Sequence, residues 1–340
     1  MTEPTPVTLS RKDFQSDQEV RWCPGCGDYN VLAALQILMP DLGIPRENLV
    51  FISGIGCAAR FPYYMNTYGM HSIHGRAPAI ATGLAVARPD LSVWVVTGDG
   101  DGLSIGGNHL IHALRRNVNV KILLFNNQIY GLTKGQYSPT SEVGKVTKST
   151  PFGSLDHPFN PISLAIGAEA TFVARTHDMD RKHMHSVISA ASRHDGSSFV
   201  EIYQNCNVFN DGAFDFTTRE RSHQILLEHG KPIRFGENDE KGAVWEDGGL
   251  RVVDVADVGE DSVAVHDAHR EDPSLAFALS RLSSGPTTPT PLGIFRQVSR
   301  PSYGQQVQRQ IVDALDRQGP GHLEELLYNK NAIWEVPANT

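Results

Sequence analysis

Two side chains with hard oxygen donors, Asp99 and Asn127, are spaced so that they can bind one metal ion together. Asp99 lies in the glycine-rich segment Gly98-Asp99-Gly100-Asp101-Gly102, and Asn127 is the second of two adjacent asparagines. A carboxylate, an amide oxygen and a nearby backbone carbonyl can hold Mg²⁺ while phosphate oxygens complete its octahedron. The glycines let backbone N–H groups approach the phosphate. This combination predicts a site for a magnesium–diphosphate group.

The elements that must position these residues are two strands and the helix between them. An apolar run over residues 91–97 ends at the glycine-rich segment, which is predicted to be a loop, and a second run over residues 120–125 ends at the asparagines. Residues 108–116 are predicted to form a helix. Strand, helix and strand form a right-handed unit whose two strand ends meet at one edge of a parallel sheet. The predicted magnesium site therefore lies at that edge.

Two other interpretations of the glycine-rich segment are a turn with no ligand and a dinucleotide-binding loop. The dinucleotide motif needs a third glycine where this sequence has Leu103, and no acidic residue follows at the usual distance. The chain also lacks a G-x-x-x-x-G-K-[ST] phosphate loop. A lone Gly-Asp-Gly would favour the plain turn, but its ordered combination with the paired asparagines favours the magnesium–diphosphate site.

The four cysteines are a second set of residues that can do chemistry. Cys23 and Cys26 form a C-x-x-C pair, whereas Cys57 and Cys206 each follow a predicted strand, at the same sheet edge as the magnesium site. Four thiolates that converge there suit either zinc or a 4Fe–4S cluster. Structural zinc sites usually use two close pairs, so the wide separation of Cys57 from Cys206 favours one cluster, with zinc as the alternative.

Composition excludes several classes of function. The chain has 340 residues, 40% of them apolar and 20% charged, as is usual for a soluble enzyme. Its formal net charge of −8 argues against nucleic acid or an anionic membrane as the partner. No apolar run is long enough to span a membrane, and the first residues lack an apolar signal region. We expect a cytoplasmic protein, because four cysteines are too few for a disulfide scaffold and fit a reducing compartment.

Alternating strand and helix patterns from residue 28 to residue 203 predict an α/β fold, a doubly wound parallel sheet of the diphosphate-binding type. We predict an N-terminal arm over residues 1–21, a cofactor-binding domain over residues 22–215, and an irregular C-terminal extension over residues 216–340 that packs on the domain or on a partner. We also expect a helix over residues 179–194 capped by Asp178, a linker or crossing segment over residues 283–293 and a helix over residues 305–327.

Six short motifs, in order along the chain, carry a resemblance to a known family. They are CPGCG at residues 23–27, SGIGC at 53–57, HGR at 74–76, the GDGD…NN pair at 98–127, YGLTKGQ at 130–136 and QNCN at 204–207. In this combination the sequence resembles the β subunits of 2-oxoacid:ferredoxin oxidoreductases, and among them the 2-oxoglutarate type. The resemblance covers roughly residues 22–211.

The resemblance implies an enzyme that uses thiamine diphosphate, Mg²⁺ and one 4Fe–4S cluster to decarboxylate a 2-oxoacid with coenzyme A, passing electrons to ferredoxin. Asp99, Asn127 and the Ile129 carbonyl would hold Mg²⁺, and the four cysteines would ligate the cluster. Leu132, Thr133 and Lys134 are predicted to act at the reacting end, with Lys134 pairing with the distal carboxylate of 2-oxoglutarate. Cofactor contacts are expected at Ile55, Gly56, Cys57, His74, Gly98, Asp99, Gly100, Asp101, Asn127, Ile129, Tyr130, Gly131, Leu132 and Thr133.

The implied chemistry also requires a carboxylate that activates the pyrimidine ring of the cofactor, and such a residue normally comes from a second domain. This sequence contains one diphosphate-type unit, so the resemblance implies a larger α subunit as partner, in an (αβ)₂ heterotetramer. Pyruvate or a branched-chain 2-oxoacid is the alternative substrate. A non-catalytic, zinc-stabilised assembly module is the alternative from a different class. No nucleic-acid or membrane partner is expected.

Overall fold

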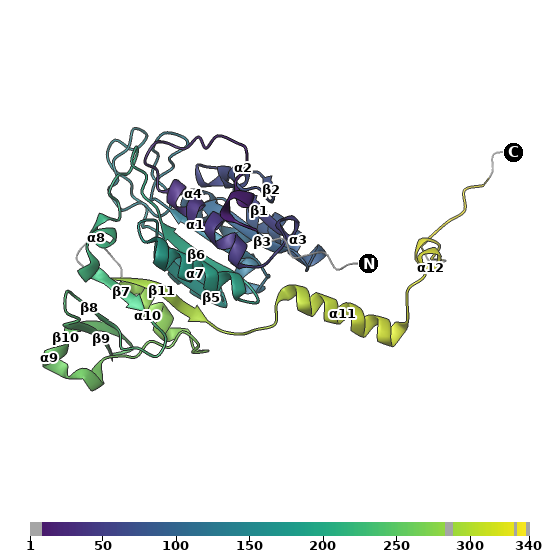
Figure 1. Cartoon of the computed structure of the whole chain (residues 1–340). Helices are drawn as coiled ribbons and strands as arrows, with labels where there is room; N and C mark the ends of the chain where they lie inside the picture. The colour runs from purple at the N-terminus through teal and green to yellow at the C-terminus, as the bar shows by residue number, and fades with distance from the viewer. Residues whose placement is uncertain (1–8, 283–287, 330–331, 338–340) are drawn as a thin grey trace.

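One large sheet organises the computed structural model, which describes residues 9–282, 288–329 and 332–337 (Figure 1). Residues 1–8 of the predicted arm and residues 283–287 of the predicted linker lie outside the described residues. The rest of the arm contains a short 3₁₀ helix, Arg11–Phe14, in which Phe14 is fully buried. This part of the arm therefore packs into the domain.

Eight strands form a mixed, mostly parallel sheet in the order β2-β1-β3-β4-β6-β5-β11-β7. Neighbouring strands run parallel, except that β11 is antiparallel to β5. The arrangement confirms the predicted α/β class. The strands are β1 (Leu49–Ser53), β2 (Tyr68–His71), β3 (Ser92–Gly98), β4 (Lys121–Asn126), β5 (Phe172–His177), β6 (Ser198–Tyr203), β7 (Gln224–Leu227) and β11 (Thr290–Gln297).

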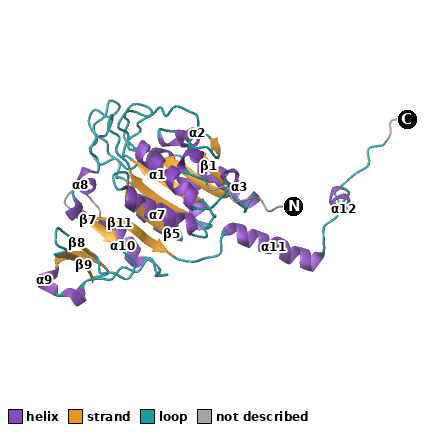
Figure 2. Ribbon diagram, viewed as in Figure 1, coloured by secondary structure: helices purple, strands orange, loops and turns teal. Residues whose placement is uncertain are grey.

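Helices cover both faces of this sheet (Figure 2). α1, α2 and α7 contribute to the apolar layer on one face, and α3, α5, α6 and α10 contribute to the layer on the other. The central strands are therefore buried on both sides, as in other doubly wound sheets. The bounds are α1 (Asp28–Asp41), α2 (Phe61–Tyr64), α3 (Ala77–Ala87), α5 (Gly107–Arg115), α6 (Pro161–Gly167), α7 (Arg181–Arg193) and α10 (Ser274–Leu282).

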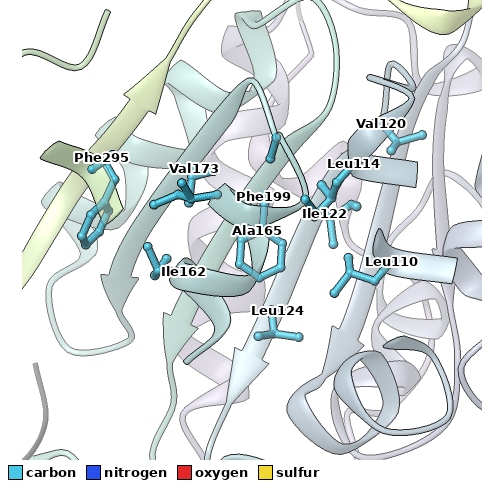
Figure 3. Packing of buried hydrophobic residues seen from close by; sticks show 14 of the residues in the cluster. Leu110, Leu114, Val120, Ile122, Leu124, Ile162, Ala165, Val173, Phe199 and Phe295 are labelled. Carbon is cyan, nitrogen blue, oxygen red and sulfur yellow. The ribbon is translucent and has the colours of Figure 1, made fainter. Parts of the chain in front are cut away.

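Alternate residues of the central strands supply the two apolar layers. Ile122 and Leu124 of β4 belong to the layer shown in Figure 3, whereas Leu123 and Phe125 belong to the opposite layer. Successive side chains of a strand point to opposite faces, so a strand that is covered on both faces has an unbroken apolar sequence. This is why the runs ending at Gly98 and Asn126 could be recognised as strands from the sequence.

The N-terminus of α7 differs from the prediction. Asp180 caps the helix, because its side chain accepts the backbone N–H of His183 at 3.0 Å. Asp178, the predicted cap, instead accepts the backbone N–H of Asn205 at 2.9 Å. A tertiary contact between the ends of β5 and β6 therefore takes the side chain that local sequence rules assign to the cap.

The predicted C-terminal extension contributes two strands to the main sheet. β7 and β11 are the last two strands at one edge of the main sheet. The linker predicted over residues 283–293 is therefore wrong for Thr290 to Gly293, which belong to β11. Between β7 and β11 the chain forms a separate three-stranded sheet in the order β10-β9-β8. The region also contains α8 (Asp215–Thr218), β8 (Arg234–Phe235), β9 (Lys241–Glu246), β10 (Gly249–Asp254), α9 (Val255–Val258) and two 3₁₀ helices, Arg221–His223 and Glu260–Ser262.

The helix predicted over residues 305–327 is interrupted. α11 (Tyr303–Gln318) ends where Gly319 adopts a φ of 73°, and Pro320 follows before α12 (Leu323–Leu327) begins. A left-handed glycine and a proline together end a helix. Figure 1 shows α11 and α12 extending away from the sheet. No helix of the described residues is both long enough and apolar enough to span a membrane.

Candidate active site

The carboxyl ends of four neighbouring strands bring the predicted motifs together. β1, β3, β4 and β6 are adjacent and parallel in the sheet. Each is followed directly by one of these segments: residues 54–57, 99–103, 127–131 and 204–207. Ligands of open α/β sheets bind at this edge. The parallel pairing of β3 with β4 therefore places Asp99 and the asparagine turn side by side.

The GDGD segment forms a short helix, α4 (Asp99–Leu103), and not the predicted loop. Asp99 and Asp101 lie in its first turn, where acidic side chains are favoured by the helix dipole. Gly100 must be glycine, because a Cβ there would lie 2.1 Å from the Tyr130 ring. The Tyr130 hydroxyl donates to the Gly100 carbonyl at 3.1 Å. The close contact holds the turn after β4 against α4.

Asp99 is a buried carboxylate whose partners are hydroxyl groups. It is 2% exposed, and it accepts hydrogen bonds from the side chains of Ser138 and Thr140. Burial raises the pKa of Asp99 to about 6, although these two hydrogen bonds favour the ionised form. A carboxylate in such surroundings is stabilised strongly by a neighbouring cation. The sequence did not identify Ser138 and Thr140, because they lie in an irregular segment with no periodicity or motif to mark them.

The turn after β4 carries the other predicted Mg²⁺ ligands. Gln128, between Asn127 and Ile129, has a φ of 56°, a left-handed conformation that is uncommon for residues other than glycine. Asn127 Oδ1 accepts the N–H of Ile129 at 3.2 Å, and Asn127 Nδ2 donates to Gln204 Oε1 at 2.8 Å. The turn therefore holds Asn127 next to the Ile129 backbone and ties both to the segment that carries Cys206.

Asp101 joins several parts of the site. It is 2% exposed, and its Oδ1 accepts the backbone N–H groups of Ile55 at 3.1 Å and Gly75 at 2.7 Å. Its Oδ2 accepts the Thr97 hydroxyl at 2.7 Å. His74 Nδ1 lies 2.5 Å from Oδ1. The carboxylate thus connects the ends of β1 and β3 to the HGR motif and orients the His74 ring.

A cavity of about 110 Å³ lies between these segments. Every residue predicted to contact the cofactor lines it, together with Ala58 and Phe125. The predicted catalytic residues Leu132 and Thr133 line it as well, but Lys134 does not, because it is exposed in a turn where its φ is 74°. The structure gathers the predicted residues around one space, and their roles in that space stay predictions.

Cysteines lie directly against the wall of this cavity. Cys57 lines it, and a Cβ added to Gly131 would lie 3.5 Å from Cys57 Sγ and 3.6 Å from Cys206 Sγ. Cys26 Sγ accepts a hydrogen bond from Gln204 Nε2 at 3.3 Å. Cys23 is more exposed, and its carbonyl accepts the N–H of Cys26 at 3.0 Å. All four thiols are free of disulfides.

The CPGCG turn is attached to the segment after β6 by backbone contacts. Asn207 Nδ2 donates to the Pro24 carbonyl at 2.7 Å, and the N–H of Gly27 donates to the Asn205 carbonyl at 3.1 Å. Gly27 allows this approach, because a Cβ there would lie 1.8 Å from Asp178 Oδ2 and 3.0 Å from the Asn205 backbone nitrogen. The two cysteine-bearing segments are therefore held together independently of their thiols.

The surroundings of Cys26, Cys57 and Cys206 disfavour the ionisation of these three thiols. Burial raises the pKa of Cys57 to about 12, and it also raises the pKa of Cys26 and of Cys206. The buried carboxyl group of Asp28 adds to each of these three shifts. Such thiols become thiolates only next to a positive charge. Within the described part of the chain, no three or more His, Cys, Asp and Glu side chains are close enough to hold a single metal ion.

The fold and the site define the class of protein. The family model "Thiamine pyrophosphate enzyme, C-terminal TPP binding domain" matches residues 54–202, from the loop after β1 to the end of β6. This range includes α4, the asparagine turn and every residue that lines the cavity. The chain therefore contains a thiamine-diphosphate-binding domain.

Relatives identify the family within this class. The chain is 62% identical over 329 residues to the 2-oxoglutarate oxidoreductase subunit KorB of Mycobacterium tuberculosis, which covers 96% of this chain and 88% of the relative. It belongs to the β subunits of 2-oxoacid:ferredoxin oxidoreductases, of the 2-oxoglutarate type. The resemblance inferred from the six motifs is confirmed.

Two further comparisons agree. The 2-oxoglutarate synthase subunit KorB of Archaeoglobus fulgidus is 43% identical over 185 residues, which are 54% of this chain and 69% of the relative. A solved 2-oxoglutarate:ferredoxin oxidoreductase from Magnetococcus marinus matches with a TM-score of 0.76 and 34% identity, covering 96% of this chain and 97% of that one. That structure has 2-oxoglutarate, coenzyme A and succinyl-CoA bound.

Proposed function

We propose that this subunit binds the cofactors of an enzyme that converts 2-oxoglutarate and coenzyme A into succinyl-CoA, CO₂ and a proton, while the two electrons released reduce ferredoxin. The proposal is supported by the position of the cysteines, which lie against the wall of the cavity. Cys57 lines the cavity, and Gly131 lies between the cavity and Cys206. A cofactor that supports decarboxylation and a cluster that accepts electrons would therefore be neighbours within one chain.

The donor groups fit thiamine diphosphate and Mg²⁺. Asp99, Asn127 and the Ile129 carbonyl would hold the ion, as one charged and two neutral oxygen donors suit a cation that also binds phosphates. The fit is supported by the raised pKa of about 6 at Asp99, a buried group that a cation would stabilise. When bound, the thiazolium ring of the cofactor supplies the electron sink for decarboxylation.

The side chains around the cavity would bind and orient the cofactor and the substrate. His74 contacts Asp101 and lines the cavity, where it would donate to a phosphate oxygen of the cofactor. Leu132 and Thr133 are exposed residues of the wall that would contact the reacting end. Lys134 follows them on the surface, where we propose that it pairs with the second carboxylate of 2-oxoglutarate.

The four cysteines are the proposed ligands of one 4Fe–4S cluster. In such a cluster each thiolate binds a different iron atom, so the sulfur atoms do not surround a single ion. The raised pKa values of Cys26, Cys57 and Cys206 support this assignment, because iron supplies the positive charge that buried thiolates require. Electrons would leave the substrate through the cluster to ferredoxin.

As a β subunit, the chain functions with an α subunit. We propose an (αβ)₂ heterotetramer in which the α subunit covers the mouth of the cavity and supplies the carboxylate that activates the cofactor. Apolar residues at the mouth support this arrangement. Ile55 and Leu132 both line the cavity, yet they are 36% and 49% exposed in the isolated chain.

The proposed reaction is tested by assaying the anaerobically purified α–β complex with a panel of 2-oxoacids. We expect coenzyme-A-dependent reduction of ferredoxin with the highest kcat/KM for 2-oxoglutarate, and lower values for pyruvate and for branched-chain 2-oxoacids. Omission of coenzyme A is the control. A higher kcat/KM for pyruvate than for 2-oxoglutarate would contradict the proposed substrate. Ferredoxin reduction at the same rate without coenzyme A would contradict the proposed reaction.

A further inference from the structure

Three buried hydroxyl groups lie at the start of the irregular segment that follows the YGLTKGQ motif. Ser138, Thr140 and Ser141 are each 2% exposed, although the segment has no regular secondary structure here. Removing a hydroxyl group from water is unfavourable unless it finds a hydrogen-bond partner in the protein. The partners of these three groups therefore show what this turn does.

Ser138 and Thr140 donate to the same atom. The hydroxyls lie 2.5 Å and 2.6 Å from Asp99 Oδ2. Within the described residues, no side-chain hydrogen bond reaches Asp99 Oδ1. Both hydroxyls therefore bond to one oxygen of the carboxylate, and no described side chain bonds to the other. The backbone N–H groups of Asp99 and Gly100 also favour the ionised carboxylate.

Ser141 has a separate task. Its hydroxyl donates to the Gln128 carbonyl at 2.6 Å and accepts the backbone N–H of Ser138 at 2.8 Å. It thus fastens the turn to the left-handed residue between Asn127 and Ile129. Of the three hydroxyls, two act on the carboxylate and one on the backbone around it.

A chain of buried polar groups lies against Thr140. The Thr140 hydroxyl lies 3.0 Å from Asn126 Oδ1, and Asn126 Nδ2 donates to Glu201 Oε1 at 2.7 Å. Glu201 Oε2 accepts Arg175 Nε at 2.6 Å, and Glu201 and Arg175 are 0% and 1% exposed. The chain crosses β4, β6 and β5, so it fixes Asn126 at the rigid centre of the sheet. The Thr140 hydroxyl has one proton, which Asp99 Oδ2 receives, so Thr140 packs against Asn126 Oδ1 without a second hydrogen bond.

We propose that Ser138 and Thr140 are positioning residues that hold Asp99 Oδ2 and so present Oδ1 to the metal ion that anchors the diphosphate. The inference rests on the proposed Mg²⁺ site at Asp99. Groups that hydrogen-bond to a metal-binding side chain fix its orientation, and their loss lowers metal affinity. The competing explanation is that the two hydroxyls only fasten the loop.

The test measures the Mg²⁺ concentration that gives half-maximal thiamine diphosphate binding to the metal-stripped α–β complex. We expect Thr140→Val, which keeps the shape but removes the hydroxyl, to raise this concentration roughly 10- to 100-fold. Thr140→Ser, which keeps a hydroxyl, should need the same Mg²⁺ concentration as wild type. Saturating Mg²⁺ should restore the affinity of Thr140→Val for the cofactor. Ser138→Ala should raise the concentration in the same way and serves if Thr140→Val does not fold.

A matched control lies in the same segment. Thr147 is partly buried and bonds only to Ser149 and Thr150 among the described side chains, so Thr147→Val should leave the Mg²⁺ requirement unchanged. An unchanged requirement in both Thr140→Val and Ser138→Ala would overturn the inference. An equal increase in Thr147→Val, or a loss of cofactor binding that saturating Mg²⁺ does not restore, would show that the hydroxyls only fasten the loop. If wild type binds the cofactor equally well with and without Mg²⁺, the proposed metal site itself would be contradicted.

Discussion

Asp99 and Asp101 are two residues apart and equally buried, yet their surroundings give them different tasks. Asp101 accepts two backbone N–H groups and the Thr97 hydroxyl, and it also contacts His74. Asp99 accepts hydroxyls and keeps a raised pKa of about 6. The protein itself supplies the hydrogen-bond partners of Asp101, whereas the surroundings of Asp99 are suited to a cation.

The two aspartates should therefore respond differently to the same substitution. Asp99→Asn removes the negative charge that we propose binds Mg²⁺, so Mg²⁺-dependent binding of thiamine diphosphate should fall at least about 100-fold, while the unfolding temperature of the cofactor-free complex is kept. Asp101→Asn turns an NH₂ group toward backbone donors and should cost about 1–3 kcal/mol of stability. Cofactor titration and thermal unfolding of both variants measure these effects. Wild-type cofactor affinity in Asp99→Asn would refute the metal assignment.

Lys134 is the residue through which the substrate is proposed to be selected. A charge-assisted contact with the distal carboxylate contributes about 1.5–3 kcal/mol, so Lys134→Ala should raise the KM for 2-oxoglutarate roughly 10- to 100-fold. The KM for pyruvate, which has no distal carboxylate, should change little. Lys148→Ala is the control, since Lys148 is an exposed lysine of the following segment. Equal losses on both substrates would show that Lys134 supports structure or the α subunit.

Site residues were predictable where a motif follows a strand. Asp99, Asn127, Cys57 and Cys206 each stand just after an apolar run, so the parallel sheet alone brings them to one edge. Ser138 and Thr140 were not predictable, because their contact with Asp99 depends on how an irregular segment folds back. The sequence likewise did not reveal that Asp101 is occupied by protein donors, since those donors come from two other segments.

At the scale of elements, the attachment of the CPGCG turn to the end of β6 holds the thiols together. Gly27→Ala places a Cβ where Asp178 and the Asn205 backbone lie, so the two segments must separate. We expect lower iron content and a stability loss of roughly 1–3 kcal/mol, with thiamine diphosphate still bound. Iron analysis and cofactor titration check this result.

A glycine in open space is the control for that substitution. Gly83 lies in α3 with no atom within 4 Å of the position of a Cβ, so Gly83→Ala should retain iron and gain up to about 1 kcal/mol of helix stability. Full iron content in Gly27→Ala would show that the attachment does not hold the proposed cluster ligands in place.

The elements that the sequence predicted well are those whose pattern reflects local burial. β3, β4 and β6 are apolar runs because helices cover both of their faces. α4 was missed because glycine disfavours helices in general, whereas here Gly100 is needed for contact with Tyr130. β11 was missed because its proline and glycine suggested a linker, and its antiparallel pairing with β5 is a long-range contact that no local signal announces.

At the scale of the whole molecule, buried histidines make stability depend on pH. Burial lowers the pKa of His177 and of His194 to about 4, from 6.5. Both are neutral in the folded chain, whereas the unfolded chain takes up protons below pH 6.5. The stability they contribute is therefore complete above pH 6.5 and is lost as the pH falls from 6.5 toward 4. At pH 5 the loss is about 2 kcal/mol for each histidine.

His194→Gln tests this dependence. The variant removes one titrating group and keeps a side chain that can bond to the Thr171 hydroxyl, which lies 2.8 Å from His194 Nε2. The fall in the unfolding temperature of the complex between pH 7.5 and pH 5 should be smaller than in wild type, by roughly 4 °C. An identical fall in both proteins would show that His194 does not titrate in this range.

The most direct test of the whole account asks whether the cavity and the cysteines of this chain form one path for electrons. Electron paramagnetic resonance of the anaerobic α–β complex is recorded after 2-oxoglutarate and coenzyme A are added. Wild type, with about four iron atoms per β subunit, should show a reduced 4Fe–4S signal. Cys206→Ala should keep thiamine diphosphate but lose the signal. A substrate-dependent signal that survives in Cys206→Ala, or wild type with zinc and no iron, would contradict the account.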